Sequence, residues 1–229
     1  MGNTATAATM ERRVRELIDD LGATPFNTSE TVLGWLNDGG CELHLLFATT
    51  YEDYLRERFT ITTDAREPPE YALPDNLFKC LGVDWVISTT DRRRMEKFSN
   101  AERNTRQNGF PDRFLVPSYR LVGSQIEMIP APGSNYTVEL FYVPQFKRLG
   151  SGDSVLDKWP YVMEGFELFA VYHAAAEALQ REEADARTML AKKEQKRAEI
   201  VEALQPRDAA EPWAVVDVES VREREQWPW

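Results

Sequence analysis

With 229 residues, of which 42% are hydrophobic and 28% charged, the chain is long enough for one large domain or two small lobes, and its aromatic content excludes a disordered chain. Its 38 acidic and 27 basic residues give a net charge of -11, which repels phosphate backbones and argues against a general nucleic-acid binder. The two cysteines exclude a disulfide framework, and with no signal peptide or membrane span in the pattern we expect synthesis in a reducing cytoplasm.

Residues 1–58 have the spacing of two amphipathic helices. The first should end at Gly22, and its apolar stripe is Met10, Val14, Leu17, Ile18 and Leu21. The second can be capped by Asn27, Thr28 or Ser29, and its apolar positions are Val32, Leu36, Leu43, Phe47, Tyr51 and Tyr54. Gly39 and Gly40 interrupt this stripe, and each lowers helix propensity by about 1 kcal/mol. They indicate either a close helix crossing or a weak point.

Residues 59–150 change to β patterning. Phe59–Thr63 alternates and is rich in β-formers, and Cys80–Ile87 predicts a further strand. Between them, prolines keep Tyr71–Pro74 extended. Ser99 and Glu102 have capping-box spacing and predict a short helix that ends near Asn108-Gly109.

The strongest β signal lies between Pro111 and Pro144. Two strands, 119–122 and 125–129, flank Gly123-Ser124, which suits a two-residue hairpin turn. A turn over 130–135 leads to a third strand, 136–142, in which Val138, Leu140 and Tyr142 share one face. We therefore expect a three-stranded antiparallel meander.

Residues 151–204 predict one long helix that starts around Pro160 and ends at Pro206. Its seam is Val162, Phe166, Phe169, His173 and Ala176. From Arg181 onward mixed charges dominate, which is typical of a solvated or intersubunit helix. Because helical stripes occur only at the two ends of the sequence, we expect these helices to pack together.

The resulting fold class is α+β, with a helical bundle formed by N- and C-terminal helices, a β-rich antiparallel insertion, and an extended C-terminal tail. The expected boundaries are 1–58, 59–150, 151–204 and 205–229. The last segment lacks helical periodicity, yet it holds Trp213, Trp227 and Trp229 beside three prolines. Since disordered tails rarely carry three tryptophans, this segment either packs back on the domain or inserts into a partner.

We find no constellation for catalysis, and we expect no catalytic, cofactor-binding or metal-binding residues. Cys41 and His44 share a helical face, but Cys80 and His173 are too isolated in sequence to complete a zinc site, so we expect a core cysteine beside a surface histidine. Glu164, Glu167 and Glu177 lie on the long helix without the Glu-x-x-His step of di-iron bundles. His173 and Glu177 are spaced as a helix-face pair. Phosphate-binding loops and nucleophile elbows are absent from the sequence.

The order of these pieces resembles the head-to-tail connector, or adaptor, proteins of tailed bacteriophages. The resemblance covers about residues 10–204, and each stretch is degenerate alone. The stretches are the opening helix 10–21, Val32–Asn37, Tyr71–Phe78 before the strand at Val83, the strands from Tyr119 to Pro144, and the helix Phe166–Leu204. The Trp-rich end beyond Gln205 matches no fixed pattern of that family.

The resemblance implies a structural virion protein without catalytic residues. Such adaptors form a ring, commonly of twelve copies, beneath the portal protein, where they extend the DNA channel and carry the tail. The expected partners are the portal, a downstream tail or neck protein, and genomic DNA that passes without sequence-specific binding. The expected location is the virion neck after synthesis in the host cytoplasm, with no membrane partner. A C-terminal segment commonly docks onto the portal, so we expect the anchors to be Trp213, Trp227, Pro228 and Trp229.

Three alternatives stay open. The chain could be another neck or tail-completion protein of the same virion. An enzyme with an unrecognised active site would need Cys41, His44 or the helix carboxylates to converge in a pocket. A DNA-binding module would need Arg92–Arg94 to join Arg103 and Arg106 in one exposed patch.

Overall fold

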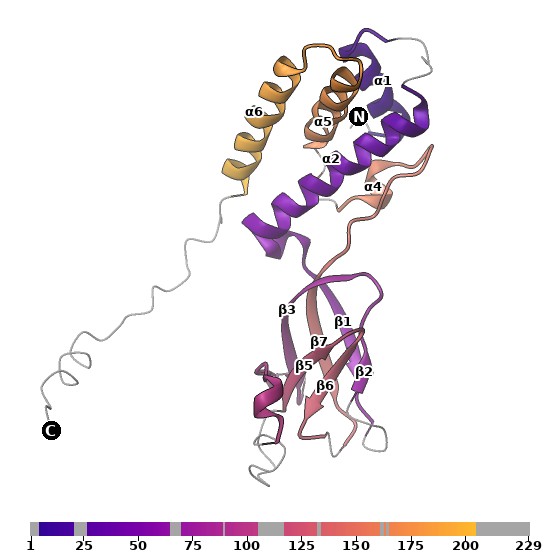
Figure 1. Cartoon of the computed structure of the whole chain (residues 1–229). Coiled ribbons are helices and arrows are strands. Elements are labelled where there is room, and N and C mark those ends of the chain that lie inside the picture. Colours follow the sequence, from indigo (N-terminus) through magenta and orange to yellow (C-terminus); the bar gives the residue numbers. More distant parts are fainter. Residues whose placement is uncertain are drawn as a thin grey trace, which may run out of the picture.

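The computed structural model describes residues 5–20, 27–64, 70–88, 90–104, 117–131, 134–160, 163 and 165–204. It has two lobes joined at a narrow waist (Figure 1). The helical lobe holds α1 (Ala7–Leu17), α2 (Ser29–Thr50), α4 (Val155–Lys158), α5 (Glu167–Arg181) and α6 (Arg187–Ala203). The chain enters the β lobe through the short helix η1 (Glu52–Leu55) and returns after the last strand. The predicted mixed α+β class is confirmed.

Threonine caps fix the starts of the first two helices. At α1, the Thr9 amide donates to Thr6 Oγ1 at 3.2 Å and the Thr6 amide donates to Thr9 Oγ1 at 2.8 Å. At α2, the predicted cap is confirmed, because Thr28 Oγ1 accepts from the Thr31 amide at 3.3 Å. Such a cap contributes about 1 kcal/mol.

The end of α1 differs from the predicted stop at Gly22. The helix ends at Leu17, and Asp19 turns into the left-handed region with φ of 56°. The Asp20 amide then bonds back to the Arg15 carbonyl at 3.0 Å, which is the closing bond of a Schellman motif. Aspartate tolerates this conformation, so no glycine is needed.

The single long helix predicted over 160–204 is wrong. The structure has two helices, α5 and α6, which lie side by side as a hairpin (Figure 1). Glu183 breaks the helix with φ of 57°, and the Ala184 amide bonds to the Leu179 carbonyl at 2.8 Å. This is again a Schellman motif, but it carries glutamate where glycine is usual, so the sequence has no visible stop signal.

Gly39 lets α2 cross α5 at close range, and on the same helix Gly40 makes room for the Trp159 ring. A Cβ added at Gly39 would lie 2.9 Å from the backbone Cα of Ala170, and one at Gly40 would overlap the ring of Trp159. Of the two interpretations of this pair, the close helix crossing is therefore confirmed. The apolar stripe of α2 is buried along this contact, at Val32, Leu36, Leu43 and Phe47.

The β lobe consists of two antiparallel sheets. One has the order β1 (Glu57–Thr62), β7 (Thr137–Pro144), β3 (Leu77–Val86), β4 (Arg92–Arg94). The other has the order β2 (Glu70–Ala72), β6 (Gln125–Ile129), β5 (Ser118–Val122). Their apolar faces share one core, which includes Val83, Ile126, Met128, Val138 and Leu140.

The meander prediction is half right. The hairpin β5–β6 turns at Gly123-Ser124 as expected, with Gly123 at φ of 57°. However, β7 pairs with β1 and β3 in the opposite sheet and not with β6. Stacking β6 and β7 face to face buries the apolar side of both strands, whereas a lone three-stranded sheet would leave that side uncovered.

The short segment after β4 agrees with its predicted start. Asn100–Glu102 forms one turn of 3-10 helix, and the Ser99 amide donates to the Glu102 carboxylate at 2.9 Å in a capping box. The predicted end at Asn108-Gly109 lies outside the described residues.

The glycine crossing yields a stability prediction with an internal control. Gly39→Ala should lower the free energy of unfolding by about 1–3 kcal/mol, because the new methyl group forces α2 away from the backbone of α5. Gly34→Ala lies in the same helix with nothing within 4 Å of the added Cβ, so it should raise stability by about 0.5–1 kcal/mol. Urea unfolding of the two variants measures both values, and equal effects would contradict the close crossing.

Candidate functional site at the waist

The returning chain is tied to α2 by one buried asparagine. Asn37 Nδ2 donates to the Leu149 carbonyl at 3.0 Å, and the Leu149 amide donates to Asn37 Oδ1 at 2.7 Å. The side chain thus satisfies a backbone donor and acceptor that have no strand beside them. This contact fixes residues 144–149 beneath α2 and so sets the geometry of the waist.

An aromatic cluster joins the two lobes at this point. The ring centroid of His44 on α2 lies 6.0 Å from that of Phe78 on β3 and 5.9 Å from that of Phe146. Phe146 in turn lies 5.7 Å from Trp159, whose ring covers Gly40. These edge and tilted contacts connect residues that are far apart in sequence.

The pair Cys41 and His44 is arranged opposite to our expectation. Cys41 is exposed, and His44 has only 3% of its surface exposed. Burial lowers the pKa of His44, although a hydrogen bond to the Pro144 backbone opposes the shift. Within the described residues, His44 Nε2 and the neighbouring Trp159 Nε1 are buried without a hydrogen-bond partner. His44 is therefore held neutral inside the waist.

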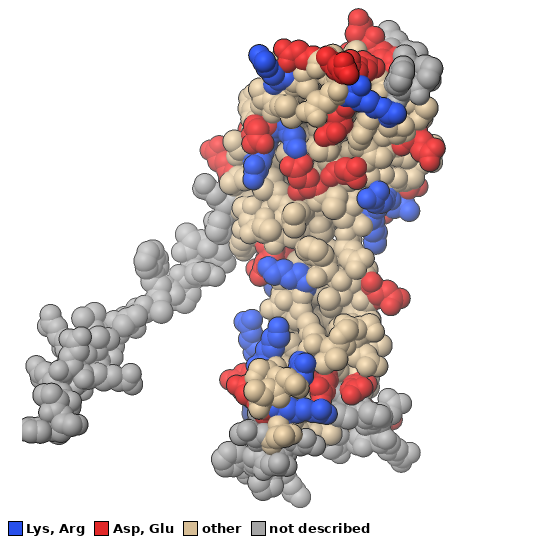
Figure 2. Space-filling view, in the orientation of Figure 1, with Lys and Arg blue, Asp and Glu red and all other residues tan. Residues whose placement is uncertain are grey.

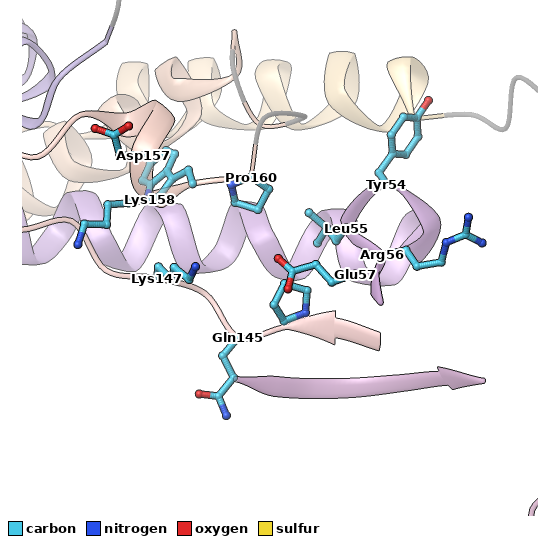
Figure 3. A pocket seen from close by; sticks show the side chains of 11 residues that line it. Tyr54, Leu55, Arg56, Glu57, Gln145, Lys147, Asp157, Lys158 and Pro160 are labelled. Carbon is cyan, nitrogen blue, oxygen red and sulfur yellow. The ribbon is translucent and has the colours of Figure 1, made fainter. Parts of the chain in front are cut away.

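A pocket of about 270 Å³ opens on the waist where η1, the end of β7 and the end of α4 meet (Figure 3). Its apolar lining includes Leu55, Pro144, Trp159 and Pro160. Charged side chains stand around this lining and include Arg56, Glu57, Lys147, Asp157 and Lys158. Because both lobes contribute to it, the pocket exists only when the waist is assembled.

Most of these charged groups already have a contact. Glu57 accepts a hydrogen bond from the Tyr142 hydroxyl at 3.0 Å, and Arg56 lies 5.5 Å from the centroid of the Phe141 ring. Lys158 pairs with Asp153 at 3.6 Å. Lys147 is exposed and makes no ion pair with any residue that the structure describes. It is the cation available to a ligand.

The residues considered for an active site do not converge. His173 lies against α6, where Lys193 Nζ is 3.0 Å from His173 Nδ1 and 2.6 Å from Glu42 Oε2. Glu167 accepts from the Gly165 amide at the start of α5, and Glu164 lies outside the described residues. Among the described residues, no group of three or more His, Cys, Asp and Glu side chains could hold a metal ion.

Three of the arginines considered for DNA binding are engaged with acidic groups of their own lobe, whereas Arg94 donates to the Leu81 carbonyl at 3.5 Å. Arg92 contacts Glu139 at 2.8 Å, and Arg58 contacts the same buried carboxylate at 3.3 Å. Arg103 contacts Glu127 at 3.1 Å, and Arg93 contacts Asp91 at 3.2 Å. Arg106 lies outside the described residues. These pairs consume much of the positive charge that a phosphate backbone would need.

Charge is divided unevenly between the lobes. Residues 57–149 contain 12 acidic and 13 basic side chains, so all of the net negative charge belongs to the rest of the chain. Figure 2 shows acidic side chains spread over the helical lobe and a group of basic side chains on one side of the β lobe.

Apolar side chains at the waist are a further feature that the sequence pattern did not single out. Leu45 follows His44 on α2 and is 49% exposed, and Phe78, which contacts the His44 ring, is 50% exposed. The predicted anchors Trp213, Trp227, Pro228 and Trp229 lie outside the described residues.

Neither a protein-family model nor a curated protein matches this sequence. In the part of the chain that the structure describes, no helix combines the length and the apolar character needed to cross a membrane.

Burial of His44 predicts a pH dependence of stability. Since its folded pKa lies below the ordinary value of 6.5, the unfolded chain takes up a proton on this ring first. Stability should be complete above pH 6.5 and should fall as the pH drops through the folded pKa. His44→Asn keeps an N–H donor and removes the titration, so its free energy of unfolding should depend less steeply on pH below 6.5.

The pKa of His173 is also lowered by burial, so His173→Asn is the matched comparison. Each single variant should reduce the pH dependence of the free energy of unfolding, and the double variant should reduce it further. Urea unfolding across this pH range measures the slopes. A slope for His44→Asn equal to that of the unaltered protein would show that His44 is not held neutral.

Proposed function

We propose that the protein is a structural virion protein, a head-to-tail adaptor. In this role copies assemble into a ring, with twelve expected, beneath the portal protein. The ring extends the DNA channel and provides the platform for the tail. The helical lobe forms the body of the ring and carries the β lobe, and the C-terminal segment docks onto the portal.

The observation that carries this proposal is the waist. Phe78 is half exposed although its ring contacts the buried His44, and both lobes build a pocket at the same waist. Leu45, the next residue of α2, is also half exposed. Exposed large apolar side chains at such a junction are typical of a subunit that is covered by a neighbour. The Trp-rich segment after Leu204 adds further side chains of the type most enriched at interface hot spots.

The charge distribution supports passage of DNA without specific binding. An acidic helical lobe on the wall of a channel would not hold a moving polymer by its phosphates. Among the described residues of the β lobe, Arg58, Arg92, Arg93 and Arg103 are paired with carboxylates, which weakens their attraction for phosphates.

The alternatives differ in what favours them. Another neck or tail-completion protein of the same virion would use the same surfaces with a different partner, and the waist does not separate the two roles. An enzyme is disfavoured, because Cys41 and His44 face opposite environments and His173 lies against α6. We therefore propose no catalytic role, no cofactor and no membrane partner.

Native mass measurement with and without the portal protein of the same virion tests this function. We expect a complex whose mass is a multiple of the chain mass, formed alone or on the portal. In the full chain, Trp227→Ala combined with Trp229→Ala should weaken portal binding at least tenfold, because two interface tryptophans are lost. Val215→Ala combined with Val216→Ala lies in the same segment and serves as the control, with little effect.

Unchanged thermal unfolding would show that both double variants fold normally. A chain that stays monomeric in the presence of portal would contradict the adaptor role. Equal portal binding by the two double variants would contradict the docking role of the terminal tryptophans.

A further inference from the structure

The waist pocket has the size of a site for a few side chains. Its volume of about 270 Å³ lies just below the range for small-molecule sites, which run from about 300 to 1,000 Å³. Proline and aromatic residues make up most of its apolar lining, at Pro144, Trp159 and Pro160. Rings of this kind pack well against proline and aromatic side chains of an extended peptide.

The charges at the pocket favour an acidic group on that peptide. In Figure 3, the amine of Lys147 points toward the space beside Glu57, whereas Asp157 and Arg56 point away from it. Glu57 is already hydrogen-bonded to Tyr142, and Lys147 has no ion-pair partner among the described residues. A carboxylate from outside would therefore meet a free ammonium group beside the apolar lining.

The chain itself contains a segment with this chemistry. Glu211-Pro212-Trp213 places a carboxylate, a proline ring and a large aromatic ring in three consecutive positions. Proline fixes its φ angle in advance, which lowers the cost of ordering the segment on binding. The segment begins seven residues after Leu204, the last residue that the structure describes, so an extended chain can carry it about 23 Å from there.

The placement of α6 favours a neighbouring copy as the source of this segment. In Figure 1, α6 and α4 lie on opposite sides of α2, and the pocket is built partly by the end of α4. A segment that leaves the end of α6 would have to pass around α2 to enter the pocket of its own chain. A neighbouring copy whose waist faces this end of α6 would offer the segment a pocket without that detour.

We propose that the waist pocket binds Glu211-Pro212-Trp213 of a second copy of this chain, with Lys147 paired to Glu211. The inference rests on the self-assembly proposed above, and it assigns Trp213 to the neighbouring subunit. The residues 227–229 remain for the portal. Each copy then binds the next through this C-terminal segment, and in a closed ring all of these contacts form together.

The test uses the full chain with Trp213→Ala, so that its own segment does not compete, and a fluorescent peptide of residues 206–217. Saturable binding is expected. Lys147→Glu in the full chain should weaken it at least tenfold, and so should Glu211→Lys in the peptide. The two reversed charges combined should restore most of the affinity, because they recreate the ion pair in the opposite sense. Lys97→Glu, at another exposed lysine, is the control and should change little.

Photo-cross-linking from position 213, in a mixture of tagged and untagged full chains, identifies the copy that is bound. Cross-links between chains are expected, and cross-links found only within a chain would overturn the assignment to a second copy. Peptide binding that is absent, or that is indifferent to Lys147→Glu, would overturn the pocket assignment. Since the peptide assay needs neither ring nor portal, its result is independent of whether the adaptor role itself survives.

Discussion

The close approach of α2 to α5 is the constraint on which the waist depends. Gly39 and Gly40 allow the two helix backbones and the Trp159 ring to come nearer than any side chain would permit. One turn later, this approach places His44 beneath Phe146 and beside Phe78. The aromatic cluster, the returning chain at Leu149 and the pocket are therefore consequences of two positions without a Cβ. The two glycines lower the helix propensity of α2, but the packing that they allow contributes more to stability, because the Trp159 ring fills the space.

The waist joins the lobes by packing and by polar contacts, among them the ion pairs Lys79–Glu52 and Arg148–Asp38. Asn37 provides two hydrogen bonds to Leu149, but His44 Nε2 and Trp159 Nε1 lie in the same region without a partner among the described residues. A buried polar atom left unpaired costs about 1–3 kcal/mol.

Electrostatics divide the molecule into two unlike parts. In the β lobe, buried carboxylates such as Glu139 and Glu127 are met by arginines of the adjacent strands and turns. These ion pairs neutralise the buried carboxylates, so the β lobe has little net charge. The helical lobe carries an excess of acidic side chains (Figure 2). In the proposed ring around DNA, the acidic helical lobes would repel the phosphates, whereas the β lobes would be nearly neutral.

The sequence by itself determined the features whose atoms lie within a few residues of one another. The cap at Thr28, the capping box at Ser99 and the hairpin turn at Gly123-Ser124 are all local, and each was predictable.

Tertiary structure alone decided the partners of β7, because burying the apolar faces of two sheets against each other outweighs pairing with the nearest strand in sequence. It also decided the break at Glu183, where the left-handed turn uses a residue type that gives no stop signal. Tertiary structure also decided that Cys41 is exposed and His44 is buried, the reverse of our expectation. The periodicity of α2 predicts only one buried face, but the waist covers the helix on a second side. The pocket could not be predicted for this reason: its walls come from three separate parts of the chain, and only the packing of both lobes brings them together.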